Sequence, residues 1–264
     1  MPAADRPARE PLRMRTEDAV RMRTEDAVRI AATHVPGPDR EVAVVVGHGF
    51  AGHRRRPAAL AIVDRLSAYA GVIAIDFRGH GESTGRSTVG DAEILDLQAA
   101  VECARERGYR RVVTLGFSMG ASVAVRHAAL TGGVDAVVSV SGPARWFDRS
   151  TRAMRRVHWA CEAPMGRLAT RLVLHIRLER CWDPVPLSPV EVVGRIAPVP
   201  LLIVHGDQDA FFTLEHPRAL AAAAGPSAQL WIETGMGHAE EATTPRLVDR
   251  IGGWGRAAAT GPAS

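Results

Sequence analysis

The apolar positions of this chain are grouped in short continuous runs, separated by longer stretches with helical spacing. The runs are Glu41–Gly47, Gly71–Asp76, Arg111–Leu115, Asp135–Ser141, Val199–Val204 and Ala228–Glu233. Helical spacing marks residues 57–69, 91–107, 121–130 and 244–258. Strands that are apolar on both faces are typical of a parallel sheet covered by helices on both sides. The pattern predicts an α/β fold with a mostly parallel, doubly wound sheet and a site in the loops after its strands.

Near the N-terminus an eight-residue segment occurs twice, because residues 13–20 and 21–28 both read RMRTEDAV. The second copy continues into Arg29–Val35, which has the pattern of a hairpin strand. One strand can use only one copy. We therefore expect residues 1–23 to form a flexible tail, with an added edge strand or a partner arm as the alternative.

The alternation of strands and helices is interrupted at residues 143–198. This segment lies between two predicted core strands, residues 24–142 and 199–258 forming the core. It is predicted to form short helices that make a cap, or lid, over the site. Nine arginines and three acidic residues lie between Arg145 and Arg180. They indicate either a solvated basic face or a preference for anionic or carrier-borne substrates.

Length and composition are typical of a soluble globular protein. Its 264 residues suffice for one large α/β domain or two small ones, and the hydrophobic content is 46%. The formal net charge is +4, yet every basic residue is arginine. Together with abundant alanine, glycine and proline, this indicates a coding bias. Because no basic stripe with interleaved aromatic residues occurs, we expect no nucleic-acid partner.

Three cysteines, Cys103, Cys161 and Cys181, form no C-x-x-C pair, so neither a disulfide framework nor a zinc site is predicted. Cys161 and Cys181 could pair, although reduced thiols are the simpler interpretation. The first residues contain no apolar signal segment, and no apolar run reaches the ~18 residues that span a bilayer. We expect a cytoplasmic protein without a membrane partner, and its oligomeric state stays open.

The strongest chemical motif is G-F-S-M-G at Gly116–Gly120, directly after one apolar run and directly before a helical stretch. In this strand–turn–helix context the motif is a nucleophile elbow, which exposes the hydroxyl of Ser118 above the sheet. Both glycines are needed because side chains there would collide across the sharp turn.

A serine nucleophile needs a base and an orienting carboxylate. His238 follows the last strand in a glycine-containing loop, T-G-M-G-H. Asp209 follows the strand before it, in H-G-D-Q-D. Asp207 is a competitor, but we expect it to stabilise the turn itself. The other histidines lack metal-ligand spacing, so no metal is predicted.

The loop after the first parallel strand, H-G-F-A-G, supplies a candidate oxyanion hole. Its donors would be the backbone amides of Phe50 and Met119, the residue after the nucleophile. The Phe50 side chain is also expected to bind substrate. The glycine-rich turn D-F-R-G-H-G-E-S after the next strand has no evident chemistry and is interpreted as structural.

These motifs stand in the order found in the α/β-hydrolase superfamily, which the chain resembles across residues 24–258. It is similar to bacterial serine hydrolases with a small helical cap. The resemblance implies an eight-stranded, mostly parallel sheet and a triad of Ser118, Asp209 and His238 that needs no cofactor. The duplicated octapeptide and the arginine-rich cap depart from the family pattern without touching the triad.

The leading hypothesis is a serine hydrolase that cleaves small carboxylic esters through an acyl-enzyme. The alternative is a thioesterase or acyltransferase acting on carrier-bound or coenzyme A-bound acyl groups, and a perhydrolase is a weaker one. A non-catalytic binding protein on a hydrolase fold is disfavoured, because such proteins normally lose a triad residue. Fold and motifs leave acyl-chain length and leaving group open.

Overall fold

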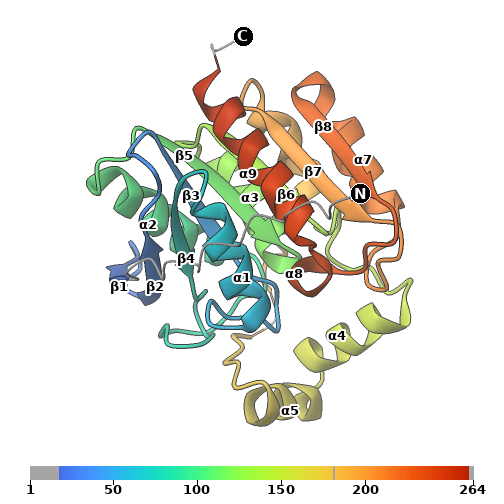
Figure 1. The fold of residues 1–264 in the computed structure, drawn as a ribbon. Coiled ribbons are helices and arrows are strands. Elements are labelled where there is room, and N and C mark those ends of the chain that lie inside the picture. The colour runs from blue at the N-terminus through green and yellow to red at the C-terminus, as the bar shows by residue number, and fades with distance from the viewer. Residues whose placement is uncertain (1–17, 181, 262–264) are drawn as a thin grey trace, which may run out of the picture.

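An eight-stranded sheet forms the centre of the computed structural model, which describes residues 18–180 and 182–261 (Figure 1). Its strand order is β1-β2-β4-β3-β5-β6-β7-β8. The strands are β1 (Asp18–Arg23), β2 (Arg29–Val35), β3 (Val42–Gly47), β4 (Gly71–Ile75), β5 (Arg111–Phe117), β6 (Ala136–Val140), β7 (Leu201–Gly206) and β8 (Ala228–Glu233). The predicted fold class is confirmed, because β4, β3, β5, β6, β7 and β8 run parallel.

Helices cover both faces of this sheet. They are α1 (Pro57–Leu66), α2 (Glu93–Glu106), α3 (Met119–Leu130), α4 (Arg152–Glu162), α5 (Pro164–Val173), α6 (Pro189–Val192), α7 (Glu215–Ala224), α8 (Ala239–Ala242) and α9 (Pro245–Thr260). One core layer contains residues of α1 and α9, and the other contains residues of α2, α3 and α7. The two layers explain why β3 to β7 are apolar on both faces.

The register of the parallel strands aligns their carboxyl ends. Gly47 at the end of β3 pairs with Ile75 of β4 on one side and with Gly116 of β5 on the other. Gly116 in turn pairs with Ser139 of β6. The loops that carry the predicted motifs therefore leave the sheet side by side at one edge.

The N-terminal segment differs from the expected tail. Residues 18–23 form β1, an edge strand paired antiparallel with β2, so the sheet begins before residue 24. Val20 of β1 is buried in the core, which accounts for the pairing. The second octapeptide copy supplies the hairpin turn, where Thr24 accepts from and donates to Val28. The alternative prediction, an added edge strand, agrees with residues 18–20 of the first copy, which are part of β1. The rest of the predicted tail, residues 1–17, lies outside the described residues.

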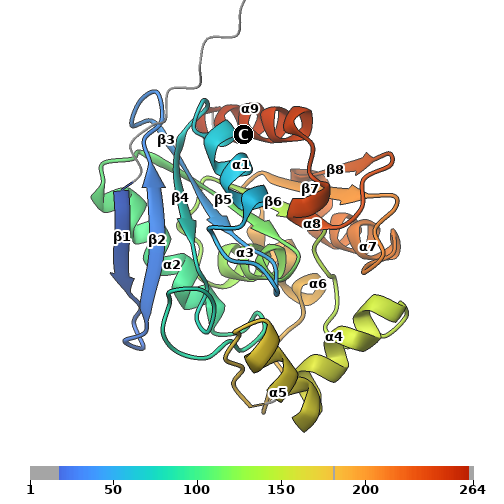
Figure 2. The ribbon, with the colours of Figure 1, turned by 60° about the horizontal axis from the view of Figure 1, so that its bottom comes forward.

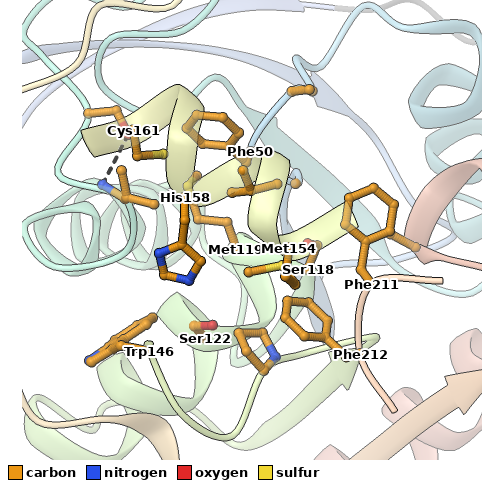
Figure 3. A pocket seen from close by; sticks show the side chains of 18 of the residues that line it. Phe50, Ser118, Met119, Ser122, Trp146, Met154, His158, Cys161, Phe211 and Phe212 are labelled. Atoms are coloured by element: carbon orange, nitrogen blue, oxygen red, sulfur yellow. Dashed lines mark hydrogen bonds between the residues drawn. The ribbon is translucent and has the colours of Figure 1, made fainter. Parts of the chain in front are cut away.

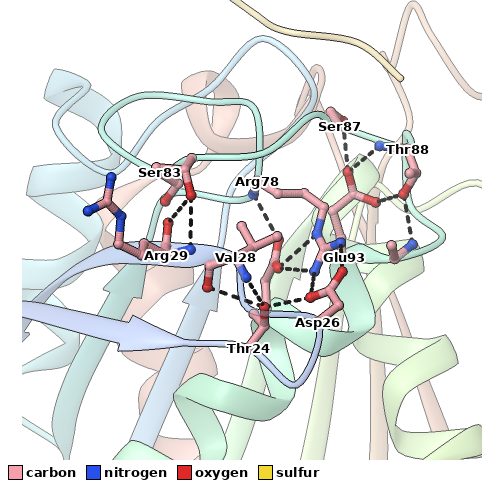
Figure 4. Close-up of polar contacts among 12 residues, drawn as sticks. Thr24, Asp26, Val28, Arg29, Arg78, Ser83, Ser87, Thr88 and Glu93 are labelled. Atoms are coloured by element: carbon pink, nitrogen blue, oxygen red, sulfur yellow. Dashed lines mark hydrogen bonds and ion pairs between the residues drawn. The ribbon is translucent and has the colours of Figure 1, made fainter. Parts of the chain in front are cut away.

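The turn after β4 ties neighbouring loops together, as the sequence predicted. Arg78 pairs with Asp26 of the hairpin turn and with the buried Asp96 of α2 (Figure 4). The Ser83 hydroxyl donates to the Asp76 carbonyl and accepts from the Ala31 amide. These contacts hold the hairpin to the parallel part of the sheet.

Residues 143–198, here called the inserted segment, contain α4, α5 and α6. In both overall views α4 and α5 lie together, away from the helices that cover the sheet (Figures 1 and 2). Thr151 caps α4, because its hydroxyl accepts from the Met154 amide. Pro164 begins α5 directly after α4 ends, and this position suits a residue without an amide hydrogen.

Candidate active site

Ser118 lies in the turn between β5 and α3 with an unusual backbone conformation. Its φ is 50° and its ψ is −113°, a region that residues with a side chain rarely adopt. The turn requires its two glycines. A Cβ on Gly116 would lie 2.0 Å from the Gly120 carbonyl oxygen, and one on Gly120 would lie 2.4 Å from the Gly47 carbonyl oxygen. Local sterics therefore dictate the G-x-S-x-G sequence.

The structure brings Ser118, His238 and Asp209 together, although up to 120 residues separate them. His238 Nε2 lies 2.9 Å from Ser118 Oγ, and His238 Nδ1 lies 2.8 Å from Asp209 Oδ2. A hydrogen on Nδ1 donates to the carboxylate, which leaves Nε2 to accept the hydroxyl hydrogen of Ser118. This arrangement can make the hydroxyl nucleophilic.

The side chain of Asp209 is fully buried and keeps its charge by hydrogen bonding. Its Oδ1 accepts from the amides of Phe211 and Phe212, at 2.8 and 3.1 Å. Burial favours the neutral acid, but the hydrogen bond and charge of His238, together with the two amides, outweigh it and hold the pKa of Asp209 below its usual value.

Asp207 has a different role, and its bond goes to another turn rather than within its own turn as expected from the sequence. Its Oδ1 accepts from the Gly235 amide at 2.7 Å, which joins the turn after β7 to the turn after β8. The two turns carry Asp209 and His238, so this bond helps to fix their relative positions. The contact with His238 belongs to Asp209.

Two aromatic residues next to His238 were not anticipated from the sequence. The ring of Phe211 stacks on the imidazole with centroids 4.2 Å apart, and the Phe212 ring meets it edge-on at 5.6 Å. They restrict the imidazole to one orientation and shield it from water. Only their position beside Asp209 in the sequence could have indicated this role.

Phe50 and Met119, whose amides are the predicted oxyanion-hole donors, line the same cavity as Ser118. Among the residues that the structure describes, neither amide has a hydrogen-bond acceptor. Met119 is the first residue of α3, so its amide also carries the positive partial charge of a helix start. Both amides are thus free to stabilise a negative oxygen.

Glu240 is a further residue of the site that sequence reasoning missed. Its Oε1 accepts from the Gly49 amide at 2.7 Å, next to Phe50 in the chain. Burial, the largest influence, raises the pKa of Glu240 above its usual value. The sequence alone does not distinguish the role of Glu240 from that of the adjacent Glu241. Only the fold shows that Glu240 contacts the loop of Gly49 and Phe50.

A cavity of about 640 Å³ opens above Ser118 (Figure 3). Its lining is mainly apolar and comes from the core loops and the inserted segment. It includes Phe50, Met119, Trp146, Met154, Cys161, Phe211 and Phe212. Phe50, the predicted substrate contact, is therefore part of the cavity wall. Such a cavity favours substrates with an apolar part.

Within residues 18–180 and 182–261, no cluster of three or more His, Cys, Asp or Glu side chains could hold a metal ion. No helix in the same ranges is long and apolar enough to cross a membrane. Cys161 lines the cavity, whereas its candidate partner Cys181 lies outside the described residues.

The comparisons with known proteins agree with the fold. Residues 43–248 match the model of the alpha/beta hydrolase family, so the chain belongs to this family and is a hydrolase by class. No match among curated proteins was found.

Solved structures with the same fold include the esterase Pf2001 of Pyrococcus furiosus, at 24% identity, 90% coverage of each chain and a TM-score of 0.73. DcsB, solved with its substrate analogue, is 16% identical over 93% of this chain and 100% of its own, with a TM-score of 0.73. Est1E of Butyrivibrio proteoclasticus, solved with ferulic acid, is 19% identical over 89% of this chain and 99% of its own, with a TM-score of 0.61.

Proposed function

We propose that this hydrolase cleaves carboxylic esters with Ser118 as nucleophile, His238 as general base and acid, and Asp209 as the orienting carboxylate. The observation that carries the proposal is the unbroken hydrogen-bond chain from Asp209 through His238 to Ser118. It ends at a hydroxyl that opens onto an apolar cavity. The similarity to the esterase Pf2001 and the match to the alpha/beta hydrolase family support the same class of reaction.

In the proposed mechanism, Ser118 Oγ attacks the ester carbonyl while His238 Nε2 takes the hydroxyl proton. The carbonyl oxygen becomes an oxyanion that accepts hydrogen bonds from the amides of Phe50 and Met119. The tetrahedral intermediate collapses, and the alcohol leaves with the proton from His238. Water, deprotonated by His238, then attacks the acyl-enzyme and releases the acid, which restores the free serine.

The inserted segment is proposed to be the cap of this site. Met154, Val157 and Cys161 of α4 line the cavity, opposite the core residues. Apolar acyl chains would lie between them and Phe50. Each methylene buried there stabilises the transition state by about 0.8 kcal/mol, or up to about fourfold in kcat/KM.

The direct test combines labelling with turnover. The chain is treated with a fluorophosphonate and its mass is measured intact, then turnover is followed on p-nitrophenyl acetate, butyrate and octanoate. We expect one adduct on Ser118 and a rate that rises with acyl length. Ser118→Ala should lose the adduct and at least about 10,000-fold in kcat. Heat-denatured protein controls for non-specific labelling. Unchanged activity of Ser118→Ala contradicts the proposal.

A thioesterase is the second candidate, favoured by arginines in the cavity wall. Arg145, Arg149 and Arg180 all line the cavity, where a phosphate-bearing leaving group could reach them. Arg149 is already paired with Glu162 at 2.6 Å, which weakens this alternative. Higher kcat/KM on acyl-coenzyme A than on p-nitrophenyl esters, falling steeply with added salt, would favour it. A salt-independent preference for simple esters would exclude it.

A further inference from the structure

Large apolar side chains are exposed mainly on one part of the molecule. Of the twelve exposed among the described residues, nine lie between Phe147 and Leu187. Six of these belong to α4, α5 and the residue that follows α5. They are Trp159, Met165, Leu168, Leu172, Val173 and Leu174, here called the cap apolar face, with exposed fractions from 42% to 73%. Soluble monomers rarely expose such residues together without an interaction partner.

Helix geometry explains why three of these side chains lie together. Met165, Leu168 and Leu172 follow at i, i+3 and i+7, which places them on one face of α5. The buried residues of α5, Gly166 and Thr170, pack against α4 instead, and the Thr170 hydroxyl lies 3.3 Å from the Ala160 carbonyl oxygen. The packing of α5 on α4 therefore leaves the cap apolar face uncovered.

Basic side chains border this face. On α4, Arg152, Arg156 and Trp159 follow at i, i+4 and i+7, and all three are exposed. On α5, Arg171 follows Leu168 by three residues. Within the described part of the chain, Arg152, Arg156 and Arg171 form no ion pair. They are distinct from the arginines of the cavity wall.

The nearest acid does not balance this charge. Glu162 at the end of α4 is engaged by Arg149 and by His158, each at 2.6 Å. Between Arg145 and Arg180, nine arginines face only three acidic residues. The surface thus combines exposed apolar side chains with three arginines that form no ion pair among the described residues, Arg152, Arg156 and Arg171.

We propose that the cap apolar face docks on an anionic lipid surface. Two short helices that expose methionine and leucine on α5, tryptophan on α4 and arginine on both suit the boundary of headgroups and acyl chains. There the apolar side chains leave water while the arginines approach the lipid phosphates.

Other occupants fit the surface less well. Two copies of this face would bring their unpaired arginines together, and like charges in contact oppose association. An acidic soluble partner would match the arginines, but it would have to supply an apolar surface of its own for six exposed side chains. A bilayer provides both the charge and the apolar layer.

The expectation of no membrane partner rested on the absence of an apolar run long enough to span a bilayer. Docking on the surface needs no such helix. The same two helices line the cavity, α4 with Met154 and Val157 and α5 with Arg167. If the proposed esterase activity holds, a docked cap would place the cavity next to lipid-dissolved esters, whereas the docking itself does not depend on catalysis.

Co-sedimentation with vesicles tests the docking. The full chain carrying Ser118→Ala is used, so that hydrolysis plays no part. It is mixed with vesicles of phosphatidylcholine, or of phosphatidylcholine and phosphatidylglycerol. We expect binding to the anionic vesicles only. Leu168→Asn with Leu172→Asn should reduce the bound fraction at least about tenfold. Arg152→Gln, Arg156→Gln and Arg171→Gln should each reduce it by up to about fivefold.

A matched control carries Leu60→Asn and Leu130→Asn, two exposed leucines outside the inserted segment, and should bind as the parent does. Thermal melting monitored by circular dichroism verifies that every variant is folded. Absence of binding to anionic vesicles overturns the proposal, as does equal binding of the Leu168→Asn, Leu172→Asn variant. A dimer in sedimentation velocity that this same variant abolishes would assign the face to a second copy and likewise overturn it.

Discussion

Glu240 accepts a hydrogen bond from the Gly49 amide at 2.7 Å, across 191 residues of sequence. The contact joins the loop that carries His238 to the loop that carries the Phe50 amide. Ala239, between His238 and Glu240, adopts a φ of 53°, and its amide lies 3.1 Å from the Ser141 hydroxyl oxygen. The segment from His238 to Glu240 therefore places an imidazole next to Ser118 and a carboxylate next to Gly49.

Removing this carboxylate should slow the chemical step. Glu240→Ala is expected to lower kcat about 10- to 100-fold with little change in KM, because a hydrogen bond to a charged group contributes about 1.5–3 kcal/mol. Glu240→Gln keeps an acceptor oxygen and should lose less. The measurement is steady-state kinetics on p-nitrophenyl butyrate.

The neighbouring Glu241 gives the control for this prediction. Its side chain is 68% exposed and lies 3.6 Å from Arg56, so Glu241→Ala should retain the parent kcat. Glu240→Gln also removes a group whose pKa burial raises. The acidic limb of its kcat profile should therefore differ from that of the parent. A full kcat for Glu240→Ala would mean that Gly49 and Phe50 are held without Glu240.

The two aspartates after β7 allow a similar comparison. Asp209→Asn should reduce kcat about 1,000- to 10,000-fold, because an amide can donate to Nδ1 and stabilise the wrong imidazole tautomer. Asp207→Asn keeps an oxygen that can accept from Gly235 and should stay within about tenfold of the parent. Equal losses for the two variants in kcat assays would contradict the assignment of the triad carboxylate to Asp209.

Features set by local sterics could be predicted from the sequence. The elbow around Ser118 is one, because its turn tolerates only glycine at both flanks, and the apolar strands of the sheet are another. Glu240 and Phe211 could not be predicted, since their roles depend on contacts that only the folded chain creates. The prediction that residues 18–23 belong to a tail was wrong. It assumed that a strand contains residues of only one copy, whereas β1 contains Asp18–Val20 of the first copy and Arg21–Arg23 of the second.

Two adjacent glycines of α9 test the packing of this helix against Tyr69, which lies between α1 and β4. A Cβ on Gly252 would lie 2.6 Å from the Tyr69 ring, whereas one on Gly253 meets nothing within 4 Å. Gly253→Ala should stabilise the protein by about 0.5–1 kcal/mol through helix propensity. Gly252→Ala should destabilise it by about 1 kcal/mol, because overpacking exceeds that gain. Urea unfolding measures both, and equal shifts would contradict the contact with Tyr69.

Acid sensitivity should depend in part on a histidine far from the site. His127 on α3 is buried, its Nε2 lies 2.8 Å from Gln98 Oε1, and burial lowers its pKa to about 4. The unfolded chain, with a pKa of about 6.5, binds a proton that the folded chain excludes. The contribution of His127 to stability is therefore complete above about pH 6.5 and is lost as the pH falls toward about 4.

The size of this effect follows from the same values. Between about pH 7.5 and about pH 5, His127 should account for a loss of about 2 kcal/mol in the free energy of unfolding. Other buried histidines, His48 and His205 among them, also have lowered pKa values and add to the acid sensitivity of the parent. The informative quantity is thus the difference between variants.

His127→Gln can still donate to Gln98 but does not titrate, so its urea-unfolding free energy should vary less with pH. His175→Gln, at an exposed position, should keep the parent slope. If all three proteins share one slope, His127 is not held neutral in the folded state.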